Sequence, residues 1–283
     1  MTVVGLGAIG LPVAINLAKS GASTFVWNRS QDSADKAIAA GATQFKNLSD
    51  NDSAIVLIIL PDLPHVDESL ANGLEGSMRS GDVLVVMGTV SPIKVVALAS
   101  RLAAKGIRLL DAPVSGGDVG AQNGTLSIMV GGDAKDLADV LPIFTKIGQT
   151  IRHLGPVGSG EMAKACNQII VAATLTAIAE AVTLGRRAGL DTTLLIDVLA
   201  GGLASSQALS MKRSNIESND YTPGGAANFQ LKDLRFALEA GEATGTSLTM
   251  TEEVTRLYVS LVESGDGGLD HSGIIREIER RSK

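Results

Sequence analysis

The chain has 283 residues and a formal net charge of −6, and 45% of its residues are hydrophobic but only 3% aromatic. A chain of this length can bury a large aliphatic core and typically forms two domains. The absence of a basic run argues against nucleic acid or an anionic membrane as a partner. One cysteine excludes an internal disulfide framework, and three scattered histidines leave no metal-site spacing. Without a signal-peptide pattern or an apolar stretch of membrane-spanning length, we expect a cytoplasmic protein.

The first half of the chain alternates predicted strands and helices. The continuous apolar run at 54–60 is typical of a strand buried on both faces of a parallel sheet. This alternation predicts a doubly wound α/β domain of the Rossmann type over residues 1–155, with ligands at the carboxyl ends of the strands. Further strands are predicted at 24–27, 83–87, 108–111, 126–130 and 150–153, and helices at 12–19, 31–40 and 95–104.

The pattern changes near Gly155 and becomes helical throughout. A helix from about 158 to 188 is apolar nearly all round, so we expect it to be buried between other elements. We therefore expect residues 156–283 to form an all-α domain for substrate binding and oligomerisation. The long apolar helix suggests a homodimer or homotetramer. The other helical patterns lie at 192–200, 229–243, 249–263 and 274–280.

A glycine-rich turn follows the first strand directly. The chain reads Val3-Val4-Gly5-Leu6-Gly7-Ala8-Ile9-Gly10, the order that a dinucleotide-binding βαβ unit requires. Gly5 allows the tight turn, Gly7 a close approach of the pyrophosphate, and Gly10 close packing of helix against strand. The free N–H groups at the helix N-terminus then face the phosphates. We predict that Gly5, Gly7, Ala8, Ile9 and Gly10 bind the cofactor.

The second strand ends in Asn28-Arg29-Ser30, where an NAD-binding chain has an acid for the ribose 2′-hydroxyl. With no carboxylate to repel it, a 2′-phosphate can pair with Arg29 and accept hydrogen bonds from Asn28 and Ser30. The sequence therefore favours NADP(H), while NAD(H) stays possible. The alternative is that Arg29 is an ordinary solvated loop residue.

Two later segments carry groups suited to chemistry. Ser115, Gly116 and Gly117 follow a predicted strand and offer a hydroxyl and backbone N–H groups to a carboxylate, although Gly-Gly is also common in plain turns. Lys164 and Asn167 share a face of the long apolar helix. Burial disfavours the charged ammonium and makes the lysine a usable general acid or base, the alternative being a snorkelling lysine near a helix end.

The remaining polar candidates carry weaker signals. Lys232-Asp233 opens a helical pattern and is either a functional pair or a surface pair, and Thr89 follows a strand. Cys166 points away from Lys164, and we expect it to be a small core residue. The histidines lack a serine or cysteine partner at any known spacing, so we assign no catalytic role to His65, His153 or His271.

Together these segments resemble the β-hydroxyacid dehydrogenases, over essentially the whole chain and in the family's order. This group includes 3-hydroxyisobutyrate dehydrogenase, tartronate semialdehyde reductase and glyoxylate/succinic semialdehyde reductase. The segments that carry the resemblance are 5–10, Leu60-Pro61-Asp62, Thr89-Val-Ser-Pro92, 111–117, 124–132, Gly158-x-Gly160-x-x-x-Lys164-x-x-Asn167 and Lys232-Asp-Leu234.

The resemblance implies roles for the matching positions. Lys164 would be the general acid/base, and Ser115, Gly116, Gly117 and Asn167 would bind a small carboxylate substrate. Leu60 and Pro61 would line the cofactor path, with Thr89 and Lys232 near the nicotinamide. Residues 28–30 are similar to those of NADP-preferring members, and Asp270-His-Ser272 is similar to the tartronate semialdehyde reductases.

Three departures from the family concern its pockets. An acid near Val86 and a serine near Gly88 are lost, which would loosen the nicotinamide pocket. Gly225 replaces a common phenylalanine, which would reshape the substrate pocket. We expect reversible hydride transfer between NADP(H) and a short 3-hydroxy acid or its aldehyde. The alternatives are an imine reductase and a cofactor-binding scaffold without catalysis.

Overall fold

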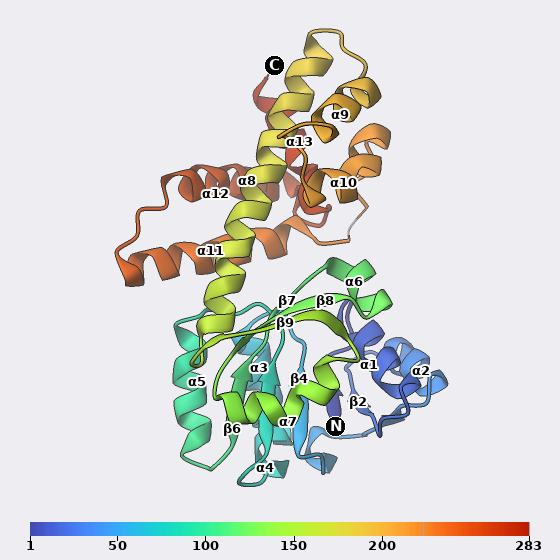
Figure 1. The fold of residues 1–283 in the computed structure, drawn as a ribbon, viewed down its shortest axis with the longest axis vertical. Helices are drawn as coiled ribbons and strands as arrows, with labels where there is room; N and C mark the ends of the chain where they lie inside the picture. Colours follow the sequence, from blue (N-terminus) through green and yellow to red (C-terminus); the bar gives the residue numbers. More distant parts are fainter. Residues whose placement is uncertain (223, 283) are drawn as a thin grey trace. The chain divides into compact units, whose positions relative to one another are not determined.

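The computed structural model describes residues 1–222 and 224–282, and the chain divides into two compact units, Met1–Lys164 and Ala165–Lys283. The first contains a largely parallel sheet with helices, and the second is helical (Figure 1). The expected fold class, a Rossmann-type α/β domain followed by an all-α domain, is confirmed.

The sheet of the first unit runs in the order β3-β2-β1-β4-β5-β6-β8-β7, with β9 paired to β8. The strands from β3 to β6 are parallel, whereas β8 is antiparallel to β6 and β7. The carboxyl ends of β2, β1, β4 and β5 therefore meet at one edge, where ligands bind in such sheets. The strands are β1 Thr2–Val4, β2 Phe25–Trp27, β3 Thr43–Gln44, β4 Ile55–Ile58, β5 Val83–Val86, β6 Arg108–Asp111, β7 Val114–Ser115, β8 Leu126–Gly131 and β9 Gly148–Gly155.

Helices cover both faces of this sheet, because alternate residues of each strand point to opposite sides. Val3 and Leu57 pack in one apolar cluster with α1, whereas Val4 and Ile58 pack in a second cluster with α5. All four side chains are fully buried. The helices are α1 Gly10–Lys19, α2 Gln31–Ala39, α3 Leu63–Ser69, α4 Glu75–Ser77, α5 Lys94–Ala103, α6 Gly117–Asn123 and α7 Ala134–Phe144, with shorter turns η1 Leu48–Asp50 and η2 Leu70–Leu74.

The second unit has its own core, in which α8 supplies Leu175 and Val182, and α12 supplies the fully buried Tyr258. The polar α10 was not predicted, because only Leu209 and Ile216 of its residues are buried. Ser206 caps it by accepting a hydrogen bond from Leu209 N. The elements are α8 Ser159–Arg187, α9 Thr192–Ala200, α10 Gln207–Ser218, α11 Ala227–Thr244, α12 Thr249–Leu261, α13 Ile274–Arg281, η3 Val262–Asp266 and η4 His271–Gly273.

Helix α8 corrects one expectation from the sequence. It is the one helix within the described residues that is long and apolar enough to cross a membrane by length and composition, although we expected no such stretch. Half of its most apolar window is buried inside the protein, as in the core helix of a globular protein. On this ground alone it is weak evidence for a membrane span.

Candidate functional site

The three glycines of the first turn differ in what surrounds them. Gly5 has φ +90°, and a Cβ there would lie 2.5 Å from Ile59 O, so the turn requires glycine. A Cβ on Gly10 would lie 1.9 Å from Gly5 O, so α1 starts against the turn. Around Gly7, by contrast, an added Cβ would meet no atom within 4 Å. The turn is thus closed by Gly5 and Gly10 and open at Gly7, where a phosphate can approach the backbone.

A pocket of about 500 Å³ lies on this open side. Its walls come from the turn and α1, from Ser33 on α2 and from α6. Gly7 and Ala8 thus face a cavity built entirely within the first unit, beside the N-terminus of α1. The other lining residues are Leu6, Leu11, Pro12, Ile15, Asp118 and Gln122.

In the segment after β2, Asn28 has a structural role, whereas Arg29 carries an exposed positive charge. Asn28 Oδ1 accepts a hydrogen bond from Leu6 N at 3.0 Å, and its Nδ2 donates to Ser30 O at 3.0 Å. The side chain of Asn28 therefore ties the glycine-rich turn to β2. Arg29 is exposed and makes no ion pair within the described part of the chain. Among Asn28, Arg29 and Ser30, Arg29 carries the positive charge that suits a phosphate.

The carboxyl ends of β4 and β5 bring Leu60 and Thr89 to the same edge of the sheet as the glycine-rich turn. Leu60 and Thr89 are half-buried, and Pro61 is exposed. A Cβ on Gly88 would lie 1.7 Å from Leu60 O. Gly88 therefore allows these two strand ends to pack closely, and the expected loosening of the nicotinamide pocket stays a prediction.

Asp111, at the end of β6, holds the N-terminus of α8. Its side chain is fully buried, and its two oxygens accept hydrogen bonds from Gly158 N and Glu161 N, each at 2.8 Å. Burial raises the pKa of Asp111, while these N–H groups act in the opposite direction. Glu161 Oε2 in turn accepts a hydrogen bond from Val90 N at 3.1 Å. The first turn of α8 is thereby fixed to β6 and to the segment after β5.

Lys164 follows on the next turn of the same helix and is only 8% exposed. Its place is set by the contacts of Asp111, which sequence reasoning did not assign to the site. The sequence does show an acid at the end of a strand and a glycine-rich helix start, but the two are 47 residues apart. No local sequence pattern connects them. Gly160 is part of the same junction, since a Cβ there would lie 2.3 Å from Met129 O.

The Ser115 loop stands between β7 and the short helix α6. Gly116 and Gly117 are exposed and have φ of +126° and +63°, which suit glycine. A Cβ on Gly117 would meet no atom within 4 Å. The loop therefore offers open backbone and the half-buried hydroxyl of Ser115, as an anion-binding turn requires.

In the helical unit, Asn167 belongs to a chain of side-chain hydrogen bonds. Asn167 Nδ2 donates to Gln168 Oε1 at 3.0 Å, and Gln168 Nε2 donates to Asp233 Oδ2 at 2.6 Å. Lys232 Nζ lies 3.1 Å from Asp233 Oδ1 and 5.2 Å from the ring centre of Phe236. The predicted Asn167, Lys232 and Asp233 are thus brought together.

Gln168 is a residue that the sequence analysis missed. Gln168 is 8% exposed, like Lys164, whereas Asn167 is half-buried. Lys164 and Gln168 are four positions apart on α8 and share a helix face. Residues three and four positions after Lys164 both share its helix face. The sequence spacing therefore did not distinguish Gln168 from Asn167. Cys166 is exposed, so the expectation that it is a core residue was wrong.

Comparisons with known proteins cover both units. Residues 1–155 match the family model described as the NAD binding domain of 6-phosphogluconate dehydrogenase. Residues 158–278 match the model described as NAD-binding of NADP-dependent 3-hydroxyisobutyrate dehydrogenase.

Curated relatives match over nearly their whole length. The chain is 36% identical over 280 residues to the 2-hydroxy-3-oxopropionate reductase of Escherichia coli K12, covering 98% of this chain and 96% of the relative. It is 34% identical to the 2-(hydroxymethyl)glutarate dehydrogenase of Eubacterium barkeri, with coverages of 98% and 94%.

Solved structures match as well. The crystal structure of a 3-hydroxyisobutyrate dehydrogenase from Salmonella typhimurium has a TM-score of 0.91 and 25% identity, covering 97% of this chain and 98% of that one. An imine reductase from Pseudomonas sp. has a TM-score of 0.66 and 19% identity, covering 98% of each chain, and shows a shared fold alone.

Proposed function

The chain belongs to the β-hydroxyacid dehydrogenase family and is an NAD(P)-dependent oxidoreductase acting on a CH–OH group, and we propose that it interconverts a short 3-hydroxy acid and its semialdehyde with NADP(H). The observation that carries the proposal is the buried Lys164, held on a helix whose start Asp111 fixes. The nicotinamide cofactor supplies or accepts the hydride. The residues of this chain bind the acid and move the proton.

Lys164 is the proposed general acid in the direction of reduction. Its ammonium hydrogen-bonds the carbonyl oxygen of the aldehyde and gives it a proton, and it takes the proton back in oxidation. Ser115, Gly116 and Gly117 hold the substrate carboxylate with a hydroxyl and backbone N–H groups. Fixing the carboxylate restricts where the carbonyl carbon can lie, which lowers the entropic part of the barrier.

The preference for NADP(H) is proposed from Arg29. Its guanidinium is exposed, makes no ion pair within the described residues and has no acid beside it in sequence. A 2′-phosphate gains a charge-assisted contact there, whereas the ribose 2′-hydroxyl of NAD(H) finds no carboxylate.

The test is a panel of 3-oxo acids, glyoxylate and succinic semialdehyde, assayed with NADPH and with NADH. We expect turnover of at least one semialdehyde acid, and a higher kcat/KM with NADPH than with NADH. Lys164→Ala should lower kcat by about 100-fold to 10,000-fold while the Kd for NADPH stays within twofold. Near-normal turnover by this variant would contradict the role of Lys164, and turnover of cyclic imines alone would favour an imine reductase.

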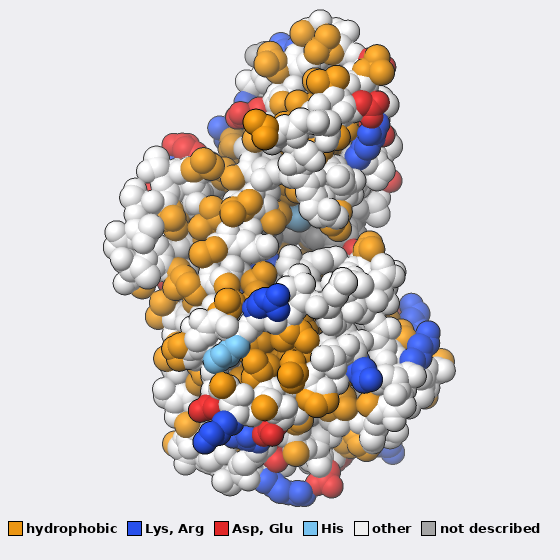
Figure 2. Space-filling view, viewed as in Figure 1, with side chains coloured by type: hydrophobic (Ala, Val, Ile, Leu, Met, Phe, Trp, Pro, Cys, Tyr) orange, Lys and Arg blue, Asp and Glu red, His pale blue; other side chains and the backbone are white. Residues whose placement is uncertain are grey.

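We also propose that a second copy of the chain covers one face of α8. Ile170 and Leu184 are 67% and 72% exposed on α8, and they lie on one helix face with the exposed Ala177. Figure 2 shows hydrophobic side chains along the helical elements. Glu180 and Arg187 flank Leu184 on either side. If two α8 helices pair antiparallel about a twofold axis near Leu184, Glu180 of each copy lies opposite Arg187 of the other copy.

The mass in solution tests this pairing. We expect a dimer or tetramer by light scattering, and dissociation by Glu180→Arg or Arg187→Glu alone. The double exchange of both residues should restore the assembly, because the pairing is symmetric. Leu141→Arg, at an exposed leucine of α7, is the matched control. A wild-type monomer at micromolar concentration would contradict the proposal.

A further inference from the structure

The first turn of α8 is joined to the segment that follows β5 at two points. Val90 N donates a hydrogen bond to Glu161 Oε2 at 3.1 Å. Gly158 lies against the same segment, since a Cβ on it would be 2.8 Å from Pro92 O. Both contacts lie within the first unit, which ends at Lys164. The segment after β5 and the start of the lysine-bearing helix therefore form one packed junction.

Glu161 is the side chain that makes this junction. It is 1% exposed and Val90 is equally buried, so water does not compete for the hydrogen bond between them. Glu161 N also donates to Asp111 Oδ2 at 2.8 Å. Glu161 thus contacts the end of β6 through its backbone and the segment after β5 through its side chain. A side chain that packing and hydrogen bonds hold in this way has one defined position.

Lys164 lies one helical turn beyond Glu161. Residues three positions apart share a helix face, and the rise along the axis between them is about 4.5 Å. Because α8 is one continuous helix from Ser159 to Arg187, a shift of its first turn relative to β5 also moves Lys164. The hydrogen bond of Glu161 therefore fixes the height of Lys164 above the segment after β5.

The segment after β5 lies at the edge of the sheet where the cofactor is expected. The carboxyl end of β5 is at the same edge as the glycine-rich turn, and ligands of parallel sheets bind at that edge. Thr89, which the family resemblance places near the nicotinamide, directly precedes Val90. The residue that hydrogen-bonds Glu161 is therefore the immediate neighbour of the proposed nicotinamide contact.

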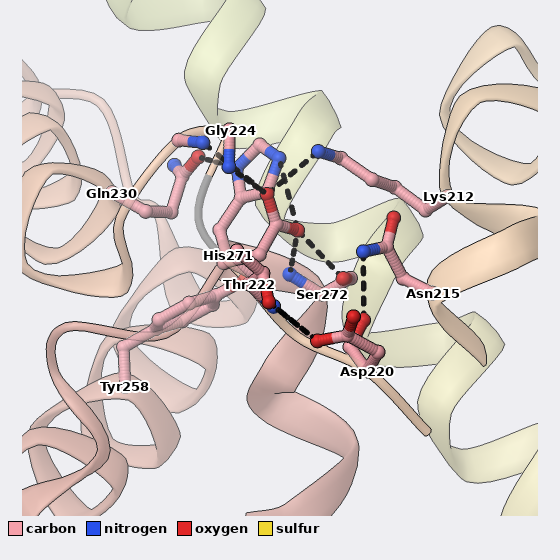
Figure 3. Close-up of polar contacts among 11 residues, drawn as sticks. Lys212, Asn215, Asp220, Thr222, Gly224, Gln230, Tyr258, His271 and Ser272 are labelled. Carbon is pink, nitrogen blue, oxygen red and sulfur yellow. Dashed lines mark hydrogen bonds and ion pairs between the residues drawn. The ribbon is translucent and has the colours of Figure 1, made fainter. Parts of the chain in front are cut away.

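A buried acid of the helical unit shows a different arrangement (Figure 3). The Asp270 side chain is fully buried and accepts from Lys212 Nζ at 2.7 Å and Ser272 Oγ at 2.6 Å. It also accepts from two backbone N–H groups of the turn before α11, at 3.3 and 3.2 Å. None of these donors has a part in the proposed reaction, so Asp270 serves the stability of the fold. Glu161 instead joins two segments of the proposed site.

We propose that Glu161 is a positioning residue that sets the distance between Lys164 and the nicotinamide-side segment after β5. It acts through Lys164, and its hydrogen bond to Val90 also transmits cofactor binding at that segment to the first turn of α8. A displacement of about 1 Å in a reacting group can cost about 100-fold in rate, so one buried hydrogen bond is enough for a kinetic effect. The inference rests on the proposed function and adds a residue to the same site.

Two variants separate the hydrogen bond of Glu161 from its charge. Glu161→Gln keeps a side-chain oxygen that accepts from Val90 N, and its kcat should stay within about threefold of the wild type. Glu161→Met keeps the volume but removes the acceptor. Its kcat for the semialdehyde acid reduced fastest should fall about 10-fold to 100-fold, while both KM values stay within about threefold. Equal losses of kcat in the two variants overturn the inference, because the hydrogen bond would then have no effect of its own.

The double variant Glu161→Met/Lys164→Ala tests whether Glu161 acts through the lysine. Two residues that act as a unit have non-additive effects, so the double variant should have the same kcat as Lys164→Ala alone. A further loss of about tenfold in the double variant would show that Glu161 acts independently of Lys164, and the inference would fail.

Hydrogen exchange tests the same junction without turnover. In the cofactor-free protein, the Val90 amide should exchange faster in Glu161→Met than in the wild type. NADPH should slow exchange over residues 158–164 in the wild type but not in Glu161→Met, although the Kd for NADPH stays within about threefold. Equal protection of residues 158–164 by NADPH in both proteins contradicts the transmission through Glu161. If Glu161→Met does not fold, Glu161→Asp, whose side chain is one methylene shorter, takes its place with the same expectations.

Thr2→Val is the matched control for a loss of stability alone. Thr2 is buried at the start of β1, the strand end opposite the proposed site, and its Oγ1 donates to Asn51 Oδ1 at 2.8 Å or Ser53 Oγ at 2.9 Å. Valine removes this hydroxyl, so the unfolding midpoint should fall while kcat stays unchanged. If Thr2→Val lowers kcat as much as Glu161→Met does, the kinetic loss reflects destabilisation and the inference is overturned.

The outcomes distinguish this inference from the proposed function. If Lys164→Ala keeps near-normal turnover, the proposed role of the lysine fails and the inference fails with it. If Lys164→Ala loses turnover while Glu161→Met keeps the wild-type kcat, only the inference is overturned.

Discussion

The two units prepare their functional groups in different ways. The first unit offers backbone and glycines at the carboxyl ends of its strands, and Gly7 and Gly117 are surrounded by open space. The helical unit instead buries polar side chains and joins them to one another, with Gln168, Gln230 and Asp233 each under 10% exposed. The first arrangement depends on the absence of side chains, and the second on the partners of each side chain. Substitutions at the open glycines of the first unit should therefore weaken ligand binding, and substitutions in the hydrogen-bonded side chains of the helical unit should weaken stability.

Loss of Lys212 should have the largest effect on stability. Lys212→Met leaves the buried Asp270 carboxylate without its ammonium partner, and breaking a buried pair costs about 3–5 kcal/mol. Urea unfolding monitored by circular dichroism measures this loss. The double variant Lys212→Met/Asp270→Asn should recover part of it, because no buried charge is left unpaired. A loss below about 1 kcal/mol for Lys212→Met would mean that the backbone donors suffice.

Gly10→Ala tests the first unit at a glycine that packing requires. The new Cβ would lie 1.9 Å from Gly5 O, so we expect a loss of about 2–3 kcal/mol in the free energy of unfolding from overpacking. Gly7→Ala is the matched variant, because its Cβ meets no protein atom within 4 Å. It should leave stability unchanged and raise the Kd for NADPH at least about tenfold, measured by fluorescence titration. Equal losses of stability would contradict the distinction between the two glycines.

The same difference explains how far sequence reasoning reaches. Most strands of the first unit and its helices α1, α2 and α5 were predicted because apolar runs and glycines are local signals, and β6 at Arg108–Asp111 has the predicted bounds. Strand β3 and helices α3, α6 and α7 were not predicted. The glycine-rich turn was found for the same reason. Helix α9 also has its predicted bounds, whereas the polar α10 has too few buried residues to show a periodic pattern.

The side-chain partners of the site could not be predicted in this way. Asp111 contacts the start of α8 47 residues away, and Gln168 contacts Asp233 65 residues away. No periodicity links positions so far apart, and the partners depend on tertiary packing. His271 illustrates the limit, because its sequence neighbours give no catalytic pairing and its hydrogen bond to Gln230 spans 41 residues.

Asn28→Asp sharpens the comparison by adding a charge to the open edge of the first unit. The carboxylate can still accept the hydrogen bond from Leu6 N, so the glycine-rich turn should stay in place. Beside Arg29, it repels a 2′-phosphate and can accept from a ribose 2′-hydroxyl. We expect the ratio of kcat/KM for NADPH over NADH to fall about hundredfold, which corresponds to about 2.7 kcal/mol. An unchanged ratio of these kcat/KM values would mean that the 2′ group of the cofactor does not bind beside residue 28.

Acid should weaken the helical unit through Asp270 by a smaller amount. Burial by itself raises the pKa of Asp270, but the charge of His271 and the hydrogen bonds from Lys212 and Ser272 outweigh it and lower the pKa to about 2. Because the folded pKa lies below the unfolded value of 3.8, the stabilisation is complete above pH 4 and is lost as the pH falls toward 2. This difference in pKa corresponds to about 2.4 kcal/mol. Urea unfolding of wild type and Asp270→Asn at pH 5, 4 and 3 isolates the contribution from other acids, and the two curves should converge with falling pH. Curves that stay parallel would show that the carboxylate is held by hydrogen bonds that an amide replaces equally well.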